Sequence, residues 1–368
     1  MSEQSPQLIA ARRTTRQILV GQVPVGGDAP ISVQSMTKTD TRDVEATVHQ
    51  IYDYAAHGCE IVRVSVPTKK AGEVFHEICD RSPIPVVADI HFDYRLALVA
   101  ADGGAACLRI NPGNIGGQDR VRAVVEKAGE KGISIRIGVN GGSLEKDLLE
   151  KFGTATPEAM VASALRHLEL LEKEGFTNTK ISLKASDVFR TVQAYRLLAR
   201  QVDYPFHLGI TEAGTPFGGT IRSSIGLGIL LAEGIGDSIR VSLTGKGEEE
   251  CDVGHEILRA LGLRTGGFRM VSCPSCGRVQ IDLDRVAHEI EQGLKEIGHE
   301  GITYAVMGCV VNGPGEARDA DLGVAGGAGE GLIYRKGDLI RKVKEQDLVS
   351  AFLEEAKRFK AELDGAKV

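Results

Sequence analysis

The stretch CLRINPGNIGGQDRVRAVVEKAGEKGISIRIGV, residues 107–139, contains the repeating unit of this chain. A short apolar strand (107–111) is followed by a helical segment (118–130) and then by a second apolar strand (134–139). Strands that alternate one for one with helices run parallel, because each helix carries the chain back to the start of the next strand. The stretch therefore predicts a parallel α/β sheet.

Apolar runs of the same character recur on both sides of this stretch. Eight strands are predicted before residue 262, at 31–36, 61–66, 85–90, 107–111, 134–139, 180–185, 206–211 and 238–243. Helical segments follow them, for example 44–57, 93–101, 118–130, 156–174, 187–200 and 249–261. Eight such units in roughly 230 residues are typical of a (β/α)8 TIM barrel. An open, doubly wound sheet is the alternative, and the count of eight favours the barrel.

The regular alternation of strands and helices ends after this predicted barrel. A strand is expected at 268–272, a helix near 283–297, a strand at 302–308 and a charged helix at 345–363. We therefore predict two domains, a TIM barrel over 1–262 that binds the substrate and a smaller α+β domain over 263–368. The glycine-rich run 325–331 is interpreted as a mobile hairpin loop, because a phosphate-binding loop needs a helix directly behind it.

Composition excludes several classes of function. The chain has 368 residues, of which 42% are hydrophobic and 26% charged, as in ordinary globular proteins. The net charge of -6 and the 5% aromatic content, without tryptophan, argue against nucleic-acid binding. No apolar run approaches the roughly 18 residues of a membrane span, and no apolar signal segment follows the N-terminal arginines. We expect a cytoplasmic protein.

Basic residues interrupt five of the predicted strands: Arg63, Arg109, Arg136, Lys184 and Arg240. Barrel strands are buried on both faces and are normally apolar. If the cations face the lumen, they converge near its carboxyl-terminal mouth, where unpaired buried charge costs several kcal/mol per ion. A polyanion such as a diphosphate compensates for this cost, and arginine suits phosphate oxygens. The alternative is pairing with structural carboxylates such as Asp89 or Glu212.

Other polar residues follow directly after predicted strands, where a TIM barrel carries its active site. They are Asp89, His91, Asn111, Asn140 and Glu212. Glu212 is a candidate proton donor or acceptor beside the cations, with a buried salt bridge as the alternative. For His91 and His207 a structural role is at least as well supported.

Three of the seven cysteines form a candidate metal site. Cys273 and Cys276 form a CxxC motif, and Cys309 precedes the turn 311–316. Three thiolates favour an iron–sulfur cluster with a weak oxygen ligand over a zinc site or a redox dithiol. His288, His299 and Glu316 are the candidates for a fourth ligand. The other cysteines, at positions 59, 79, 107 and 251, are expected to be small buried apolar residues.

The path of the chain after the last predicted barrel strand favours one arrangement of subunits. The helix 249–261 returns to the end of the barrel opposite the mouth, and a linker of about ten residues barely spans that distance. The simplest arrangement that joins cluster and anion site is a head-to-tail homodimer, in which each small domain caps the partner's barrel.

Several motifs of this sequence occur in one known family. They include VQSMT (33–37), EIVRVSVP (60–67), VADIHFDYR (87–95), CLRINPGNIG (107–116), KASDVF (184–189), LGITEAG (208–214), EGIGDSIRVSL (233–243) and MGCVVNGPGEA (307–317). With them the chain closely resembles the 4-hydroxy-3-methylbut-2-en-1-yl diphosphate synthase family of the methylerythritol phosphate pathway. The resemblance implies an iron–sulfur oxidoreductase of isoprenoid biosynthesis that opens 2-C-methyl-D-erythritol 2,4-cyclodiphosphate reductively, with loss of water.

The resemblance also implies the residues of the site. A 4Fe-4S cluster would be held by Cys273, Cys276, Cys309 and Glu316, and Glu316 would give way to a substrate oxygen. The cyclic diphosphate would be bound by Arg63, Arg109, Asn111, Arg136, Asn140, Lys184, Arg240 and Ser242. Glu212 would supply the proton for the departing hydroxyl. Because no flavin or nicotinamide fingerprint is present, electrons would come from a separate flavodoxin or ferredoxin. A zinc-dependent TIM-barrel lyase acting on a phosphorylated metabolite is the alternative function.

Overall fold

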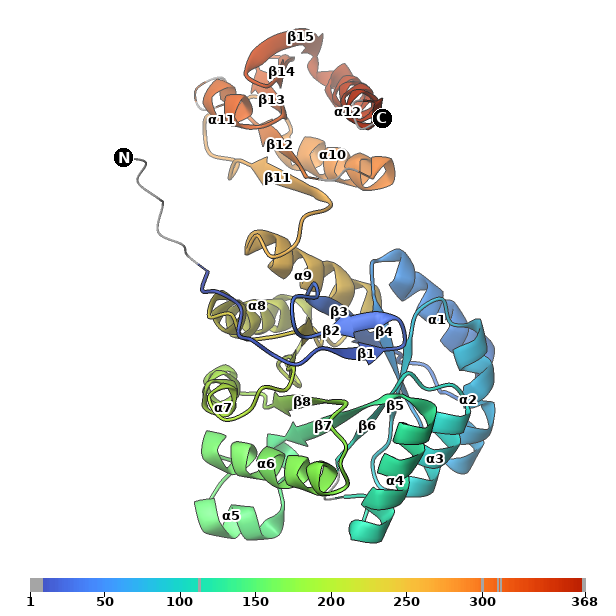
Figure 1. The fold of residues 1–368 in the computed structure, drawn as a ribbon. Helices are drawn as coiled ribbons and strands as arrows, with labels where there is room; N and C mark the ends of the chain where they lie inside the picture. Colours follow the sequence, from blue (N-terminus) through green and yellow to red (C-terminus); the bar gives the residue numbers. More distant parts are fainter. Residues whose placement is uncertain (1–8, 112–113, 299–300, 310, 312, 366–368) are drawn as a thin grey trace. The chain divides into compact units, whose positions relative to one another are not determined.

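The computed structural model describes residues 9–111, 114–298, 301–309, 311 and 313–365 (Figure 1). The chain divides into two compact units, Met1–Arg264 and Thr265–Val368. Each unit is built around its own cluster of buried apolar residues.

The first unit is a closed barrel of eight parallel strands, which confirms the predicted TIM barrel. The strands are β3 (Ser32–Met36), β4 (Ile61–Ser65), β5 (Val86–Asp89), β6 (Cys107–Ile110), β7 (Ser134–Asn140), β8 (Thr179–Lys184), β9 (His207–Leu208) and β10 (Ser238–Ile239). Their order around the sheet is β8-β7-β6-β5-β4-β3-β10-β9. A parallel bridge between Ile181 and Phe206 joins β8 to the segment that enters β9, and this closes the ring.

Helices surround the barrel on its outer face (Figure 1). They are α1 (Val44–Ala56), α2 (Lys69–Arg81), α3 (Tyr94–Asp102), α4 (Gln118–Lys131), α6 (Pro157–Lys173), α7 (Val188–Ala199), α8 (Pro216–Ala232) and α9 (Gly247–Ala260). The connection from β7 to α6 also contains a short 3-10 turn (Gly141–Ser143) and α5 (Lys146–Phe152). Outward-facing strand residues such as Val62, Leu108 and Ile137 are fully buried in the core shared with these helices.

Two predicted strands are longer in the sequence analysis than in the structure. β9 ends at Leu208 rather than residue 211, and β10 ends at Ile239 rather than residue 243. At Gly209 the backbones come too close for a side chain, since a Cβ there would lie 2.6 Å from the carbonyl oxygen of Arg240. Arg240 and Ser242 therefore follow β10 instead of lying within it.

An antiparallel hairpin that the sequence analysis did not predict closes the amino-terminal end of the barrel. It consists of β1 (Ile18–Val20) and β2 (Val23–Val25). Its apolar side chains form one cluster with the first lumen-facing residues of three strands, Ile61, Val87 and Cys107. The hairpin therefore covers the amino-terminal end of the lumen.

The second unit is a five-stranded sheet with three helices. The strands β11 (Phe268–Ser272), β12 (Ile302–Met307) and β13 (Leu322–Gly327) are parallel, and β14 (Glu330–Arg335) and β15 (Asp338–Lys344) continue the sheet antiparallel. The helices are α10 (Leu283–Ile297), α11 (Gly313–Asp319) and α12 (Leu348–Gly365). The principal core of this unit contains side chains from the sheet, α10 and α12, including Tyr304, Leu294 and Phe352.

The glycine-rich run 325–331 forms a hairpin, as predicted, but its interpretation as mainly a loop is wrong. Most of it is paired strand, since Leu322 aligns with Arg335 and Gly327 with Glu330, which leaves only a two-residue turn. Its glycines allow close packing: a Cβ on Gly331 would lie 2.2 Å from the side chain of Leu348. Within the described residues, no helix is long and apolar enough to cross a membrane.

Candidate functional site

The barrel lumen gathers the five predicted cations. Side chains alternate along a strand, so the residues two positions after Ile61, Val87 and Cys107 share their lumen face. These residues are Arg63, Asp89 and Arg109. The register then aligns Arg109 with Arg136 on β7, and Asn140 with Lys184 on β8.

One buried carboxylate compensates part of this charge. Asp89 lies 3.1 Å from Nη1 of Arg109, 3.7 Å from Nε of Arg63 and 3.5 Å from Nε2 of His91. Burial raises the pKa of Asp89, but Arg63, the hydrogen bond from His91 and Arg109 together lower it well below its usual range. The carboxylate is therefore ionised, and pairing with Asp89 is correct for two of the arginines.

A second buried carboxylate was not foreseen. Glu250, in the first turn of α9, lies 3.4 Å from Nη2 of Arg240 and 3.1 Å from Nζ of Lys38. It also accepts hydrogen bonds from the Ser35 hydroxyl at 2.9 Å and from the Leu243 backbone N–H at 3.1 Å. Glu250 thus fixes both Arg240 and the backbone next to Ser242. No pattern in the strands pointed to this residue, because it belongs to a helix.

Arg136 and Lys184 form no ion pair with a carboxylate among the described residues. Arg136 is fully buried, and its Nε and Nη1 have no hydrogen-bond partner among the described residues. Burial and the neighbouring Arg109 lower the pKa of Arg136 to about 10. The pKa of the Lys184 ammonium is lowered well below its ordinary value by burial, then by Arg136 and Arg63. Five cations thus face two carboxylates, which favours an anionic ligand.

Three further residues shape this lumen, and sequence reasoning missed them. Gly138 and Gly209 provide space, since a Cβ would lie 2.4 Å from Nε of Arg109 at the first and 2.8 Å from Nζ of Lys184 at the second. The Sδ of Met36 lies 3.0 Å and 2.9 Å from Nε and Nη2 of Arg63. Glycine inside a predicted strand is the signal that could have indicated this close approach.

The polar residues expected at the mouth have different environments. Asn111 is buried directly after β6, Asn140 ends β7 half-buried, and Ser242 is half-buried after β10. Glu212 is exposed in the turn after β9, and it makes no ion pair within the described part of the chain. Its φ of 52° is in the left-handed region that non-glycine residues rarely adopt. The expected salt-bridge alternative for Glu212 is therefore wrong.

The three candidate cysteine ligands follow the ends of two neighbouring parallel strands in the second unit. Cys273 follows β11 and Cys309 closely follows β12, and the Gly308 N–H donates to the Sγ of Cys273 at 3.3 Å. Cys276 is exposed, and hydrogen bonds from the Arg278 backbone and guanidinium lower its pKa, which favours the thiolate. Glu316 is exposed on α11.

These donors suit a thiolate-bound cluster chemically, but the described side chains do not converge on one point. Among the described residues, no three cysteine, histidine or carboxylate groups lie close enough to hold a metal ion. Of the alternative zinc ligands, His288 is exposed on α10 and hydrogen-bonds to Gln292 at 2.9 Å. His299 lies outside the described residues.

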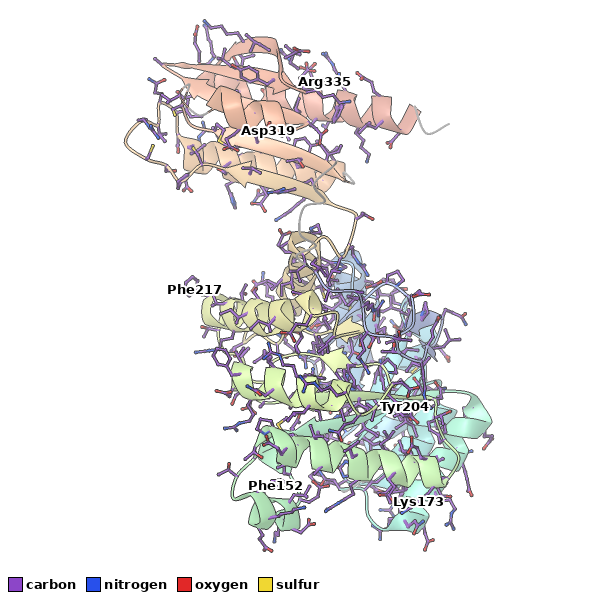
Figure 2. The ribbon with its side chains drawn as sticks, turned by 60° about the vertical axis from the view of Figure 1, so that its left-hand side comes forward. Phe152, Lys173, Tyr204, Phe217, Asp319 and Arg335 are labelled. Atoms are coloured by element: carbon purple, nitrogen blue, oxygen red, sulfur yellow. The ribbon has the colours of Figure 1, made fainter. Side chains whose placement is uncertain are left out.

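Large apolar side chains are exposed near both sites. Phe92 follows β5, Phe189 lies in the first turn of α7 after β8, and Phe217 lies in the first turn of α8 after β9. Phe217 is 83% exposed and stands at the surface (Figure 2). Val311, two residues after Cys309, is 63% exposed. Exposed apolar residues of this size commonly mark surfaces that contact other proteins.

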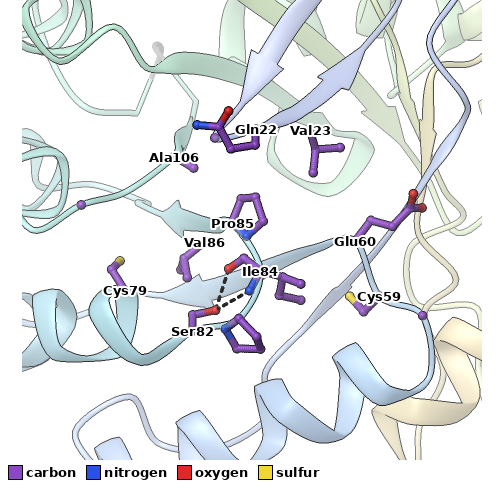
Figure 3. Close-up of a pocket in the computed structure, with 14 residues that line it drawn as sticks. Gln22, Val23, Cys59, Glu60, Cys79, Ser82, Ile84, Pro85, Val86 and Ala106 are labelled. Atoms are coloured by element: carbon purple, nitrogen blue, oxygen red, sulfur yellow. Dashed lines mark hydrogen bonds between the residues drawn. The ribbon is translucent and has the colours of Figure 1, made fainter.

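A pocket of about 700 Å³ lies at the opposite, amino-terminal end of the barrel (Figure 3). It is lined by the turn of the β1–β2 hairpin and by the residues that directly precede β4, β5 and β6. None of its lining residues is basic, and most are apolar or glycine. This pocket is therefore not the site that the lumen cations form.

Comparison with known proteins covers both units. The GcpE TIM-barrel domain matches residues 15–255, and the GcpE protein C-terminal domain matches residues 269–358. Among solved structures, 3-dehydroquinate dehydratase from Geobacillus kaustophilus is 11% identical, with a TM-score of 0.51 over 68% of this chain and 98% of that chain. That likeness shows the barrel fold alone.

Curated relatives match almost the whole chain. A 4-hydroxy-3-methylbut-2-en-1-yl diphosphate synthase (flavodoxin) of Geobacter sulfurreducens is 61% identical over 348 residues, which are 95% of this chain and 98% of the relative. The synthase of the same name from Maridesulfovibrio salexigens is 57% identical over 355 residues, 96% of this chain and 99% of the relative. The chain belongs to the GcpE family, whose members include these 4-hydroxy-3-methylbut-2-en-1-yl diphosphate synthases.

Proposed function

We propose that this chain converts 2-C-methyl-D-erythritol 2,4-cyclodiphosphate into 4-hydroxy-3-methylbut-2-en-1-yl diphosphate in isoprenoid biosynthesis. The observation that carries the proposal is the excess of buried cations over carboxylates among the described residues of a lumen that the β1–β2 hairpin covers at its amino-terminal end. The printed names of the relatives supply the diphosphate product, and the family resemblance implies the cyclic diphosphate as the substrate. A zinc-dependent lyase is not favoured, because those relatives are named for a flavodoxin-dependent reaction.

The lumen would hold the diphosphate of the substrate. In this proposal Arg63, Arg109, Arg136, Lys184 and Arg240 contact phosphate oxygens, and the polar residues Asn111, Asn140 and Ser242 orient the molecule. Opening the cyclic diphosphate frees a phosphate oxygen, so the diphosphate gains negative charge as the C–O bond breaks. Preorganised cations stabilise this developing charge more in a buried site than in water. The same excess of positive charge thus strengthens the binding of the substrate and also accelerates the cleavage of the C–O bond.

The overall reaction takes up two electrons and releases one molecule of water. Glu212, at the mouth after β9, would donate the proton that leaves with the substrate hydroxyl. An exposed carboxyl group can regain that proton from solvent between turnovers. The position of Glu212 supports this role. If the cations bind the diphosphate, the carbon skeleton of the substrate lies on the side of the mouth, where Glu212 is.

A 4Fe-4S cluster would supply the electrons, and Cys273, Cys276, Cys309 and Glu316 would hold it. The donor set supports this, since thiolates prefer iron–sulfur clusters and the lowered pKa of Cys276 keeps that ligand ready. An oxygen ligand such as Glu316 is the weakest of the four and the easiest to exchange. A flavodoxin or ferredoxin is the proposed electron donor, in agreement with the relatives' printed name.

We propose a cytoplasmic homodimer in which the small domain of one subunit serves the barrel of the other. Arg264 contacts Glu60 and the carbonyl oxygen of Ile31, which directly precede β4 and β3, so the chain leaves the barrel opposite the mouth. Only residues 265–267 separate Arg264 from β11. The exposed Phe92, Phe189 and Phe217 around the mouth and Val311 beside Cys309 suit surfaces that become covered.

The test is the iron and acid-labile sulfide content of anaerobically purified protein, followed by an assay of the cyclic diphosphate with a reduced donor. About four of each per chain, with brown absorption, is the expected result. Cys276→Ser should lose iron, whereas Cys79→Ser, outside the cluster site, should retain it. Stoichiometric zinc without iron after anaerobic reconstitution, or an iron-loaded enzyme that does not turn over the substrate, would refute the proposal.

A further inference from the structure

A sixth cation lies in the lumen besides the five described above. Lys180 on β8 is fully buried and aligns with Arg136 on β7. Alternation along β8 places it on the same face as Lys184, four residues further toward the mouth. Its Nζ has no hydrogen-bond partner within the described part of the chain.

Among the described residues, the groups that interact electrostatically with Lys180 include no carboxylate. They are Arg136 from β7, the Cys107 thiol from β6 and His207 from β9. His207 is held neutral, since burial, Lys184 and Arg136 lower its pKa well below the ordinary value. The buried carboxylates Asp89 and Glu250 are already paired with other lumen cations. Lys180 thus has no carboxylate counterion in the described part of the chain.

A buried lysine without a counterion loses its proton easily, and a nearby anion restores it. Burial is the largest effect on Lys180 and lowers its pKa; Cys107 opposes this and Arg136 adds to it, so that the pKa is lowered to about 8. A diphosphate above Arg136 and Lys184 would reverse this by adding negative charge to the same enclosed lumen. Binding and protonation are then coupled by linkage.

We propose that Lys180 takes up a proton when the cyclic diphosphate binds, and so adds a sixth positive charge to the lumen beside Arg136. This inference rests on the proposed function, because it needs the diphosphate in the lumen. Lys180 is a positioning residue, since it acts on the substrate through the field of the lumen rather than through contact. The added charge then also favours the more negative, ring-opened product.

The experiment is titration calorimetry of the oxidised holoenzyme with the cyclic diphosphate under anaerobic conditions. Without an electron donor the substrate binds and does not react. Measurements in buffers with different enthalpies of ionisation, such as HEPES and Tris, give the number of protons taken up. We expect this number to be larger at pH 8.5 than at pH 6.5, where Lys180 is already protonated.

Lys180→Met removes the charge while retaining most of the volume, and Lys173→Met on the exposed surface of α6 is the matched control. Lys180→Met should take up fewer protons than wild type at pH 8.5, with the uptake by Lys184 remaining, and should bind the substrate roughly tenfold more weakly at pH 7, equivalent to about one pKa unit of coupling. Lys173→Met should behave as wild type. The unfolding temperature of substrate-free Lys180→Met should not fall, because an unpaired buried charge is removed.

The outcomes separate the two proposals. If the wild-type protein does not bind the cyclic diphosphate, the proposed function fails and this inference fails with it. If it binds without pH-dependent proton uptake, or if Lys180→Met takes up protons as wild type does, only the inference is overturned. The measurements on the wild-type protein at pH 6.5 and pH 8.5 test the inference even if Lys180→Met does not fold.

Discussion

Glycines in the lumen determine where the arginine side chains can lie. At Gly138 a Cβ would approach Nε of Arg109 to 2.4 Å, and this guanidinium is already fixed by Asp89 on its other side. Gly138→Ala should therefore displace Arg109 and raise KM by roughly tenfold or more, since one charge-assisted contact contributes about 1.5–3 kcal/mol. Steady-state kinetics with the cyclic diphosphate measure this change.

The control for that substitution is Gly129→Ala on α4, where no atom lies within 4 Å of the added carbon. Alanine favours a helix over glycine by roughly 0.5–1 kcal/mol, so this variant should gain stability and retain its KM. A KM for Gly138→Ala equal to that of wild type would show that Arg109 does not contact the substrate.

Glu212 is the proposed proton donor, and its substitution should affect the chemical step rather than binding. Glu212→Gln retains the size of the side chain but removes its acidic proton, so binding should be retained while kcat falls by roughly 100-fold or more. Single-turnover kinetics with reduced enzyme separate the two effects. Glu126→Gln, an exposed change on α4, should leave both unchanged. A normal kcat for Glu212→Gln would exclude Glu212 as the proton donor.

Asp89 contrasts with Arg136, because it is a paired buried charge. Asp89→Asn leaves Arg63 and Arg109 without their carboxylate, and this should lower the free energy of unfolding by about 3–5 kcal/mol at pH 7. The native pKa of Asp89 is depressed, so its contribution is complete above its ordinary pKa of about 3.9 and is lost as pH falls below it. Urea unfolding of the two proteins between pH 3 and pH 7 should show the difference shrinking toward low pH. A constant difference would contradict the ionic origin.

At the scale of the element, the β1–β2 hairpin closes the lumen and offers two adjacent residues with opposite environments. Val20 is fully buried against the first residues of the barrel strands, whereas Leu19 is 52% exposed. Val20→Ala should cost about 1–3 kcal/mol of unfolding free energy through the cavity it leaves. Leu19→Ala should change it by less than about 0.5 kcal/mol. Equal effects in denaturant unfolding would mean that the hairpin does not pack as a plug.

The sequence pattern predicts the eight barrel strands because apolar runs and helices alternate over the whole first unit. It predicts the ends of β9 and β10 poorly, since the approach of Gly209 to Arg240 is a tertiary contact. The hairpin strands have three residues each and show no period. The run 325–331 resembles a loop in composition, but its glycines serve packing against residues distant in sequence, such as Leu348.

The site shows the same division between local and tertiary information. Charges inside apolar strands reveal Arg63, Arg109 and Arg136 because such charges violate the strand pattern. Glu250 lies on the polar first turn of a helix, where acidic residues are common, so only the structure shows that it is buried beside Arg240. Lys180 begins its strand next to the polar segment before it, and its depth in the lumen becomes visible only from the register with Arg136.

At the scale of the whole molecule, the proposed chemistry requires that a barrel and a cluster domain work together, and we propose that they belong to different chains. Each unit has its own apolar core, and the chain leaves the barrel at the end opposite the mouth. A cation-lined barrel without electrons and a cluster without a substrate site are each inactive alone. Complementation between two inactive variants therefore reports which units cooperate.

Arg136→Met disables the barrel, and Cys276→Ser disables the cluster domain, so each homodimer should be inactive. In a mixed dimer that works between subunits, the intact cluster of the first variant serves the intact barrel of the second, and one of the two sites is complete. Random mixing by coexpression makes about half of all dimers mixed, so about a quarter of the wild-type activity per active-site pair should return. If each cluster served the barrel of its own chain, every site would contain one defect and no activity would return. The assay uses reduced flavodoxin as the electron donor. Separately purified variants that are mixed without subunit exchange are the control. The result distinguishes catalysis between subunits from catalysis within one subunit.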